Sequence, residues 1–154
     1  METLLPLAAR AATILKARGH TIAVAESSSG GLVSAALLAQ PGASAYFLGG
    51  GVVYTRVSRE ALLDMAREEI IPSSETSALN LARAAKRRLG ADWGLAETGA
   101  AGPTGPAGRT FVALCGAMEI ARSIDTNVRD RVENMRLFTE AALELLAETL
   151  EALP

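Results

Sequence analysis

Hydrophobic and polar residues follow two patterns along the chain, a helical spacing and short continuous apolar runs. Apolar residues recur every three to four positions from Leu4 to Leu15, with Gly19 placed to end a helix, and similar segments follow capping or turn residues; they predict amphipathic helices. Short apolar runs with β-branched residues predict buried strands. The predicted helices are residues 4–15, 32–39, 58–69, 72–89 and 130–153, and the predicted strands are residues 21–25, 46–55, 92–96, 110–115 and 118–123.

The order of these elements indicates the fold class. Helices and strands alternate first, and a hairpin joined at Gly116 comes late. This order predicts an α/β layered domain with a mixed sheet. A chain of 154 residues suits one domain over residues 1–154. The glycines at 49–51 predict a bulge in their strand or a close approach by another group.

Composition excludes several classes of protein. A net charge of −2 leaves no basic field for nucleic acid, and no apolar run reaches the ~18 residues of a membrane helix. Met1-Glu2-Thr3 lacks the start of a secretory signal, and a single cysteine, Cys115, fits a reducing compartment, so we expect a cytoplasmic protein. One histidine and one cysteine argue against a zinc site, and we expect no metal and no cofactor.

Two glycine-containing turns follow predicted strands, where ligands bind in open α/β sheets. Residues 26–31, Glu-Ser-Ser-Ser-Gly-Gly, lead into a helix, where backbone N–H groups hold an oxyanion and a serine serves as nucleophile in known enzymes. Spacing alone favours the alternative that Ser27 to Ser29 cap the helix. Residues 98–103 form either a ligand-binding turn or an ordinary connection. Neither turn has the lysine of a P-loop or the dinucleotide fingerprint.

The remaining candidates for chemistry are weaker. His20 opens the first predicted strand and Ser27 follows its far end, roughly 20 Å away at ~3.3 Å per residue. His20 therefore does not activate Ser27 within one subunit, and we predict a surface histidine. Cys115 falls in an apolar strand as a core residue. The aromatic residues Trp93, Tyr46 and Phe47 are also predicted to lie in the core.

Four segments share their order and spacing with one known family. Residues 25–31, A-E-S-S-S-G-G, resemble its A-E-S-C-T-G-G motif. Residues 41–47, 51–54 and 98–103 resemble its P-G-S-S-A-W-F, F-V-T-Y and S/T-G-I-A-G-P motifs. From the first strand to the final helix, the chain thus resembles the CinA C-terminal domain family of competence/damage-inducible proteins, whose active members are nicotinamide mononucleotide deamidases.

The resemblance implies a three-layer α/β/α fold and metal-free hydrolysis of a carboxamide to a carboxylate and ammonia. It implies that Ser27 is the nucleophile, that Tyr54 and Thr98 line or assist the site, and that Arg129 binds a phosphate or carboxylate. Backbone N–H groups of residues 28–31 would hold the oxyanion. The expected substrate-binding residues are Glu26, Ser28, Ser29, Gly30, Gly31, Arg56, Glu97, Gly99, Gly102 and Arg129.

The chain departs from the family where the general base should lie. Arg59 stands at the position of the family's lysine, and Arg56 replaces an asparagine. An arginine stays protonated in proteins, so it does not accept the serine proton. Glu97 stands where the family has a small or apolar residue; beside two arginines we expect its pKa to be lowered. The only lysines, Lys16 and Lys86, lie in segments that should not reach Ser27.

Two functions follow from these departures. The first is an amidohydrolase that acts through Ser27, Tyr54, Arg59 and Thr98. In that case the serine proton passes to Glu97, Glu26 or water. The second is a catalytically impaired paralogue that binds a nucleotide-like or other anionic small molecule. Either function implies a small-molecule nucleotide or amide ligand, and neither needs nucleic acid or a membrane. The apolar faces of the first and last helices also leave open an interaction module or a homo-oligomer.

Overall fold

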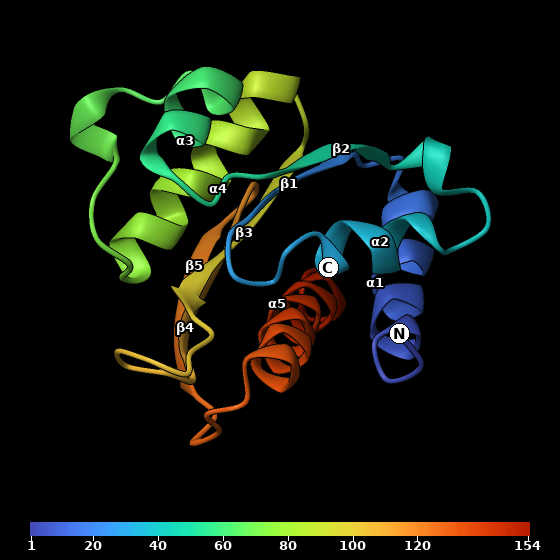
Figure 1. Cartoon of the computed structure of the whole chain (residues 1–154). Helices are drawn as coiled ribbons and strands as arrows, with labels where there is room; N and C mark the ends of the chain where they lie inside the picture. The colour runs from blue at the N-terminus through green and yellow to red at the C-terminus, as the bar shows by residue number, and fades with distance from the viewer.

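A mixed five-stranded sheet lies between two layers of helices in the computed structural model, which describes all 154 residues (Figure 1). The strands follow the order β2-β1-β3-β4-β5. They are β1 (Ile22–Glu26), β2 (Phe47–Val52), β3 (Trp93–Ala100), β4 (Arg109–Cys115) and β5 (Glu119–Asp125). The helices are α1 (Leu5–Arg18), α2 (Leu32–Leu38), α3 (Arg56–Leu63), α4 (Glu75–Leu89) and α5 (Arg131–Ala152), with single turns at Ala43–Ala45 and Arg67–Glu69.

The three-layer α/β/α architecture is confirmed. Figure 1 shows α3 and α4 on one face of the sheet and α1, α2 and α5 on the other. Each face has its own hydrophobic core, one around Leu15, Trp93 and Leu143 and the other around Leu63 and Leu81. No helix combines the length and the apolar character needed to cross a bilayer.

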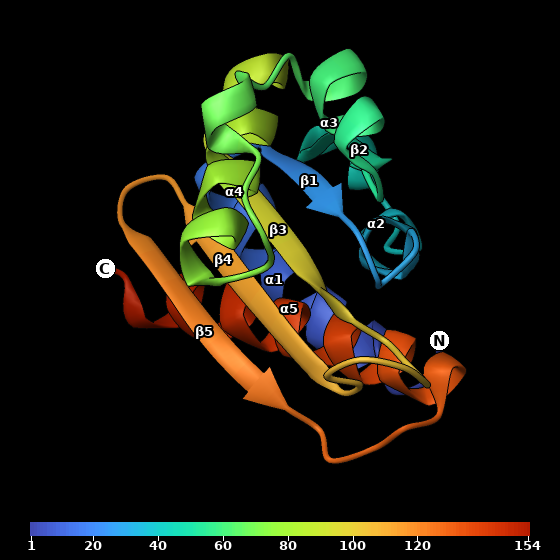
Figure 2. The same cartoon turned by 60° about the vertical axis from the view of Figure 1, so that its left-hand side comes forward.

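The parallel part of the sheet positions the site. β1 pairs in parallel with both β2 and β3, whereas β3, β4 and β5 form an antiparallel strip behind α4 (Figure 2). The carboxyl ends of β1, β2 and β3 therefore meet at one edge of the sheet, the place where open α/β sheets bind ligands.

Several predicted boundaries are confirmed to within a few residues, and two are wrong. The helix predicted over 58–69 begins at Arg56, after a capping box between Thr55 and Ser58, and ends at Leu63. It stops there because Asp64 takes a left-handed backbone conformation, with φ of 52°. The strand predicted over 92–96 continues to Ala100, because residues 98–100 pair with 109–111 of β4 rather than entering a loop.

The glycines of β2 have both predicted features. The register between β1 and β2 shifts between Phe47 and Gly49, which places a bulge at the start of the run. A side chain at Gly50 would also meet Ser34 Oγ of α2 at 2.3 Å, so glycine lets α2 pack directly on this strand. This packing holds the start of α2, and with it the serine turn, against the sheet.

His20 does not lie free at the surface, which corrects the prediction. It is half-buried, and its Nδ1 accepts a hydrogen bond of 3.2 Å from Trp93 Nε1. Trp93 itself is buried in the core. His20 therefore satisfies the indole N–H at the amino end of β1, at the opposite end of that strand from Ser27.

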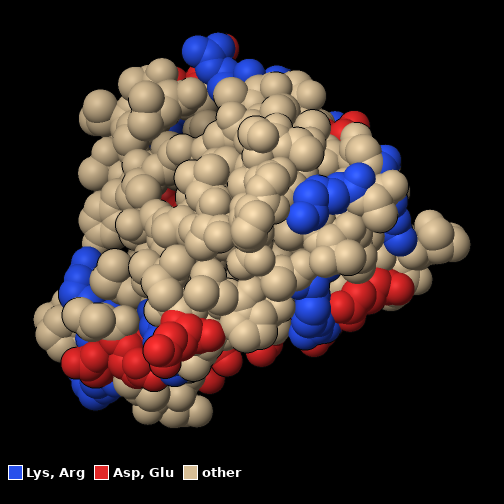
Figure 3. All heavy atoms as spheres, turned by 90° about the vertical axis from the view of Figure 1, so that its right-hand side faces the viewer, with Lys and Arg blue, Asp and Glu red and all other residues tan.

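One side of the molecule carries few charges. Residues 27–55, which include α2 and the edge strand β2, contain no Asp, Glu, Lys or Arg. Figure 3 shows a face whose centre is largely uncharged, with charged side chains mainly toward its margins. The exposed apolar residues of the segment include Leu38, Leu48 and Val52. Homo-oligomerisation stays a prediction.

Candidate functional site

A cavity of about 470 Å³ lies at the edge where the parallel strands end. Its volume is within the range of small-molecule sites. Ser27 follows β1, Tyr54 follows β2, and Gly99 lies near the end of β3, so three strands contribute to its wall. The other lining residues are Arg56 and Arg59 of α3 and the segment Ile70, Ile71, Pro72 and Ser73 before α4.

Glu26 organises the serine turn. Its fully buried carboxyl group accepts hydrogen bonds of 2.7–3.1 Å from Ser29 Oγ and from the backbone N–H groups of Gly31, Val33 and Ser34. The helix α2 is thus capped by Glu26 and not by Ser27 to Ser29, which corrects the capping interpretation. With four donors directed at it, Glu26 serves the fold of the turn and does not line the cavity.

Glu97 lies beneath the same turn. It is completely buried, and its Oε2 accepts the backbone N–H groups of Ser27 at 3.2 Å and Ser29 at 2.8 Å. Gly30 N–H donates to Ser27 O, and Gly31 N–H donates to Glu26. Most of the backbone donors expected to hold an oxyanion are therefore occupied within the protein, and Ser28 N–H alone among residues 28–31 has no partner.

The surroundings of Glu97 favour its neutral form. Thr110 Oγ1 lies 2.8 Å from Glu97 Oε1 and 3.2 Å from Thr98 O. A hydroxyl has one proton; when Glu97 is protonated it donates to Thr110, which then donates to Thr98 O, and every group is satisfied. Burial raises the pKa of Glu97 from its ordinary value, against the opposing effect of its hydrogen bonds. The expectation of a lowered pKa was wrong, because desolvation dominates.

Glu97→Gln is expected to change how stability depends on pH. Above about pH 4.5, the ordinary pKa of the side chain, Glu97 ionises in the unfolded chain, whereas burial keeps it protonated to a higher pH in the folded chain. The free energy of unfolding therefore falls as pH rises toward the raised folded pKa, by up to about 1.4 kcal/mol per pH unit. Glutamine at position 97 accepts hydrogen bonds from the same N–H groups of Ser27 and Ser29, donates one to Thr110 and has no proton to lose. The free energy of unfolding of this variant should therefore fall less steeply with pH.

Urea unfolding followed by Trp93 fluorescence from pH 4.5 to 8 measures this difference. The control is Glu119→Gln, because Glu119 lies at the surface, pairs with Arg83 at 2.6 Å and has a lowered pKa. It should retain the wild-type slope over this range. Equal slopes in the wild type and Glu97→Gln would contradict a neutral Glu97.

Arg59 points a buried cation at the cavity. Only 8% of the residue is exposed; its Nε donates to Val53 O at 3.0 Å and its Nη2 donates to Thr98 Oγ1 at 3.3 Å. No carboxylate forms a salt bridge with Arg59. Burial lowers the pKa of the Arg59 guanidinium, an effect that Glu97 opposes only when it is ionised, yet arginine remains charged in proteins.

Ser27 lies in the cavity wall, and no proton acceptor is hydrogen-bonded to its hydroxyl group. Its backbone N–H donates to Glu97, but its hydroxyl makes no hydrogen bond, so neither Glu97 nor Arg59 is hydrogen-bonded to Ser27 Oγ. Thr98 is linked to Arg59 and to Ser73 Oγ, 2.9 Å away. The chain thus brings together the serine and threonine of the predicted site with an arginine in place of a proton acceptor.

The structure adds two residues to the predicted site, and it shows that several predicted residues do not line the cavity. Ser73 lines it, and Arg131 Nη2 donates to Tyr54 Oη at 3.2 Å. Arg129 instead donates to Pro103 O at 2.6 Å in the loop before β4. The predicted residues that do not line this cavity are Glu26, Ser28, Ser29, Gly30, Gly31, Glu97, Thr98, Gly102 and Arg129. Arg131 and Ser73 were missed because no spacing pattern marks them.

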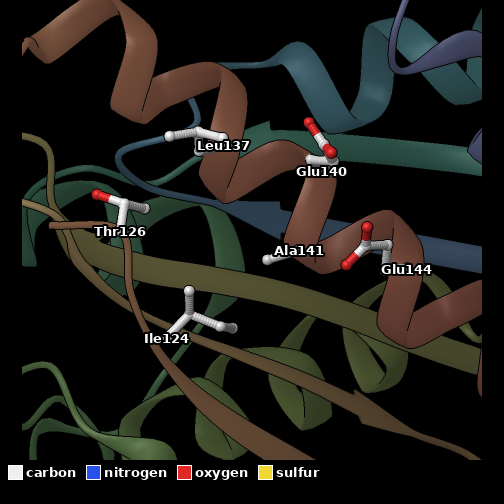
Figure 4. A pocket seen from close by; sticks show the side chains of 6 residues that line it. All are labelled: Ile124, Thr126, Leu137, Glu140, Ala141 and Glu144. Atoms are coloured by element: carbon white, nitrogen blue, oxygen red, sulfur yellow. The ribbon is translucent and has the colours of Figure 1, made fainter. Parts of the chain in front are cut away.

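A separate cavity of about 270 Å³ lies between β5 and α5 (Figure 4). Its rim has Glu140 and Glu144 on successive turns of α5, with Ile124 and Thr126 opposite. Burial raises the pKa of Glu144, with Glu140 and Glu148 adding to the effect. The cavity includes no residue of the serine turn. No cluster of three or more His, Cys, Asp or Glu side chains has the geometry to hold a metal ion.

Comparison with known proteins establishes the family. The model of the CinA C-terminal domain matches residues 4–150. The chain belongs to the CinA C-terminal domain family. A CinA-like protein of Gloeobacter violaceus is 38% identical to this CinA domain in an alignment of 151 positions that covers 91% of this chain and 35% of that protein. The chain spans about a third of the length of such curated relatives.

Solved structures agree with this assignment. The competence damage-inducible protein A (ComA) of Klebsiella pneumoniae has a TM-score of 0.90 to this CinA domain at 27% identity, covering 98% of this chain and 99% of that one. The competence/damage inducible protein CihA of Agrobacterium tumefaciens has a TM-score of 0.88 at 29% identity, covering 97% and 96%. The structural neighbours thus have the same fold as this chain and come from the same family.

Proposed function

We propose that this CinA domain binds a pyridine nucleotide that carries a carboxylate, of the nicotinic acid mononucleotide class, and that it does not efficiently hydrolyse the corresponding amide. The observation that supports this proposal is the buried guanidinium of Arg59, which faces the cavity without a counter-ion. Of its five N–H donors, two bind Val53 O and Thr98 Oγ1, which leaves three for a ligand.

The position of Arg59 selects the ligand group. Arg59 and Ser27 line one cavity, so a ligand with its carbonyl group at Ser27 occupies the cavity that the guanidinium also lines. Arginine binds a carboxylate through two parallel charge-assisted hydrogen bonds, whereas a neutral amide offers one acceptor oxygen. Arg56, which is exposed at the same cavity, is placed for the phosphate of the nucleotide.

The family's amide hydrolysis has less support in this site. Attack by Ser27 needs a proton acceptor, and the arginine at the lysine position does not supply one. The oxyanion also has few donors, because Glu97 and Glu26 occupy those of Ser29 and Gly31. The features that favour hydrolysis are Ser27 in the cavity wall and the unused N–H of Ser28.

Isothermal titration calorimetry with the acid and amide mononucleotides tests the proposal. The wild type should bind nicotinic acid mononucleotide at least about tenfold more tightly than nicotinamide mononucleotide. Arg59→Ala should weaken binding of the acid by about 10- to 100-fold, the effect of losing charge-assisted hydrogen bonds, and should remove the preference. The matched control is Arg122→Ala, because Arg122 pairs with Glu148 on the β5 side.

Two results would overturn the proposal. Equal binding of acid and amide would contradict the role of Arg59. Release of ammonia from nicotinamide mononucleotide by the wild type, lost in Ser27→Ala, would show the amidohydrolase activity instead.

A further inference from the structure

A second cavity continues the site along the sheet. Its volume is about 390 Å³, and it shares Ser73 and Gly99 with the first cavity. Each compartment alone falls within the range of small-molecule sites. The site therefore consists of two adjoining compartments with Ser73 and Gly99 at their boundary.

The two compartments differ in chemistry. The first contains Arg56, Arg59 and the hydroxyl groups of Ser27 and Tyr54. The second is walled by Ala100, Pro106 and the half-buried ring of Phe111, with Arg109 at its edge. An apolar wall with one aromatic ring and one cation suits a flat ring attached to an anionic group.

The fold explains why Phe111 remains accessible. Side chains two residues apart on a strand point to the same face, so Arg109 and Phe111 lie together on the face of β4 that α4 covers. The helix α4 begins only at Glu75, and Ser73 before it lines the compartment, so this end of the sheet is left uncovered. Arg109 is mostly exposed and forms a long surface salt bridge of 3.7 Å with Asp125.

We propose that the second compartment binds the second nucleoside monophosphate of a dinucleotide, with its base against Phe111 and its phosphate near Arg109. This inference rests on the proposed function, which places the pyridine nucleotide in the first compartment. The linker crosses the boundary at Ser73 and Gly99, the two residues that line both compartments. The preferred ligand is thus a pyridine dinucleotide in its acid form, such as nicotinic acid adenine dinucleotide.

Calorimetry with the mononucleotide and the dinucleotide of nicotinic acid tests this assignment. Stacking of one base on an aromatic side chain corresponds to about a 5- to 150-fold gain in affinity, so the dinucleotide should bind more tightly than the mononucleotide by that factor. Phe111→Leu should remove most of the gain and leave mononucleotide binding unchanged. Leucine retains packing against the core beneath α4, which Phe111 contacts, so the variant should fold.

Arg109→Ala should lower dinucleotide affinity alone, whereas Arg122→Ala, on the neighbouring strand, should change neither ligand. Equal affinities of the two nucleotides for the wild type, or an unchanged gain in both Phe111→Leu and Arg109→Ala, would overturn the inference and leave the proposed function standing. Failure of both nucleotides to bind would overturn the proposed function and this inference together.

Discussion

Arg59→Lys is expected to raise Ser27-dependent release of ammonia from nicotinamide mononucleotide by at least about 100-fold over the wild type. The guanidinium that it replaces lies 3.3 Å from Thr98 Oγ1 and lines the cavity with Ser27. A lysine buried there has a lowered pKa, so part of it is a neutral amine that accepts the serine proton. General base catalysis of this kind contributes about 10²- to 10⁴-fold.

Three comparisons make this result interpretable. Arg59→Lys combined with Ser27→Ala should return to the wild-type rate, which shows that the serine carries the reaction. Arg56→Lys places an amine on the first turn of the same helix α3 and should release no ammonia. The absence of any activity in a folded Arg59→Lys variant would contradict the conclusion that the missing base limits hydrolysis.

Glu26→Ala is expected to lower the free energy of unfolding by about 3 kcal/mol or more. The substitution leaves the buried N–H of Val33, the partly buried N–H groups of Gly31 and Ser34 and the buried hydroxyl of Ser29 without their acceptor. Each buried donor left unsatisfied costs about 1–3 kcal/mol, although a relaxed turn recovers part of this. Urea unfolding followed by Trp93 fluorescence measures the change.

Glu119→Ala serves as the control for this loss. Its carboxylate pairs with Arg83 at the surface, and such exposed pairs contribute about 0–1 kcal/mol. Glu26→Gln should lie between the two, because the amide oxygen retains part of the cap while its NH₂ faces other donors. If Glu26→Ala were no less stable than Glu119→Ala, Glu26 would not be the cap of α2.

The fold was predictable wherever local signals agreed with tertiary contacts. Ser74 caps α4 and Gly19 ends α1 in a left-handed conformation, as their residue types indicate. The end of α3 was not predictable, because an aspartate adopts the left-handed conformation where a glycine would have been the usual signal. The length of β3 depended on pairing with β4, a contact that no local pattern encodes.

The candidate site was predictable only as a set of motif positions. Ser27, Tyr54 and Arg59 line one cavity, at positions that the family motifs indicate. Glu26 and Glu97 have roles that their positions in the sequence do not reveal. Both are buried carboxyl groups, but one caps α2 and the other occupies the N–H groups of Ser27 and Ser29.

The sequence by itself determined the order of the elements and the α/β class. It also showed that no lysine stands where the family has its base. These features are accessible from sequence because periodicity, capping and residue identity are local properties. The tertiary structure decided which donors of the serine turn remain unused, that burial and not the arginines dominates the pKa of Glu97, and that Arg59 lacks a counter-ion. These properties depend on desolvation and on distances between segments up to about 70 residues apart, which only the folded chain brings together.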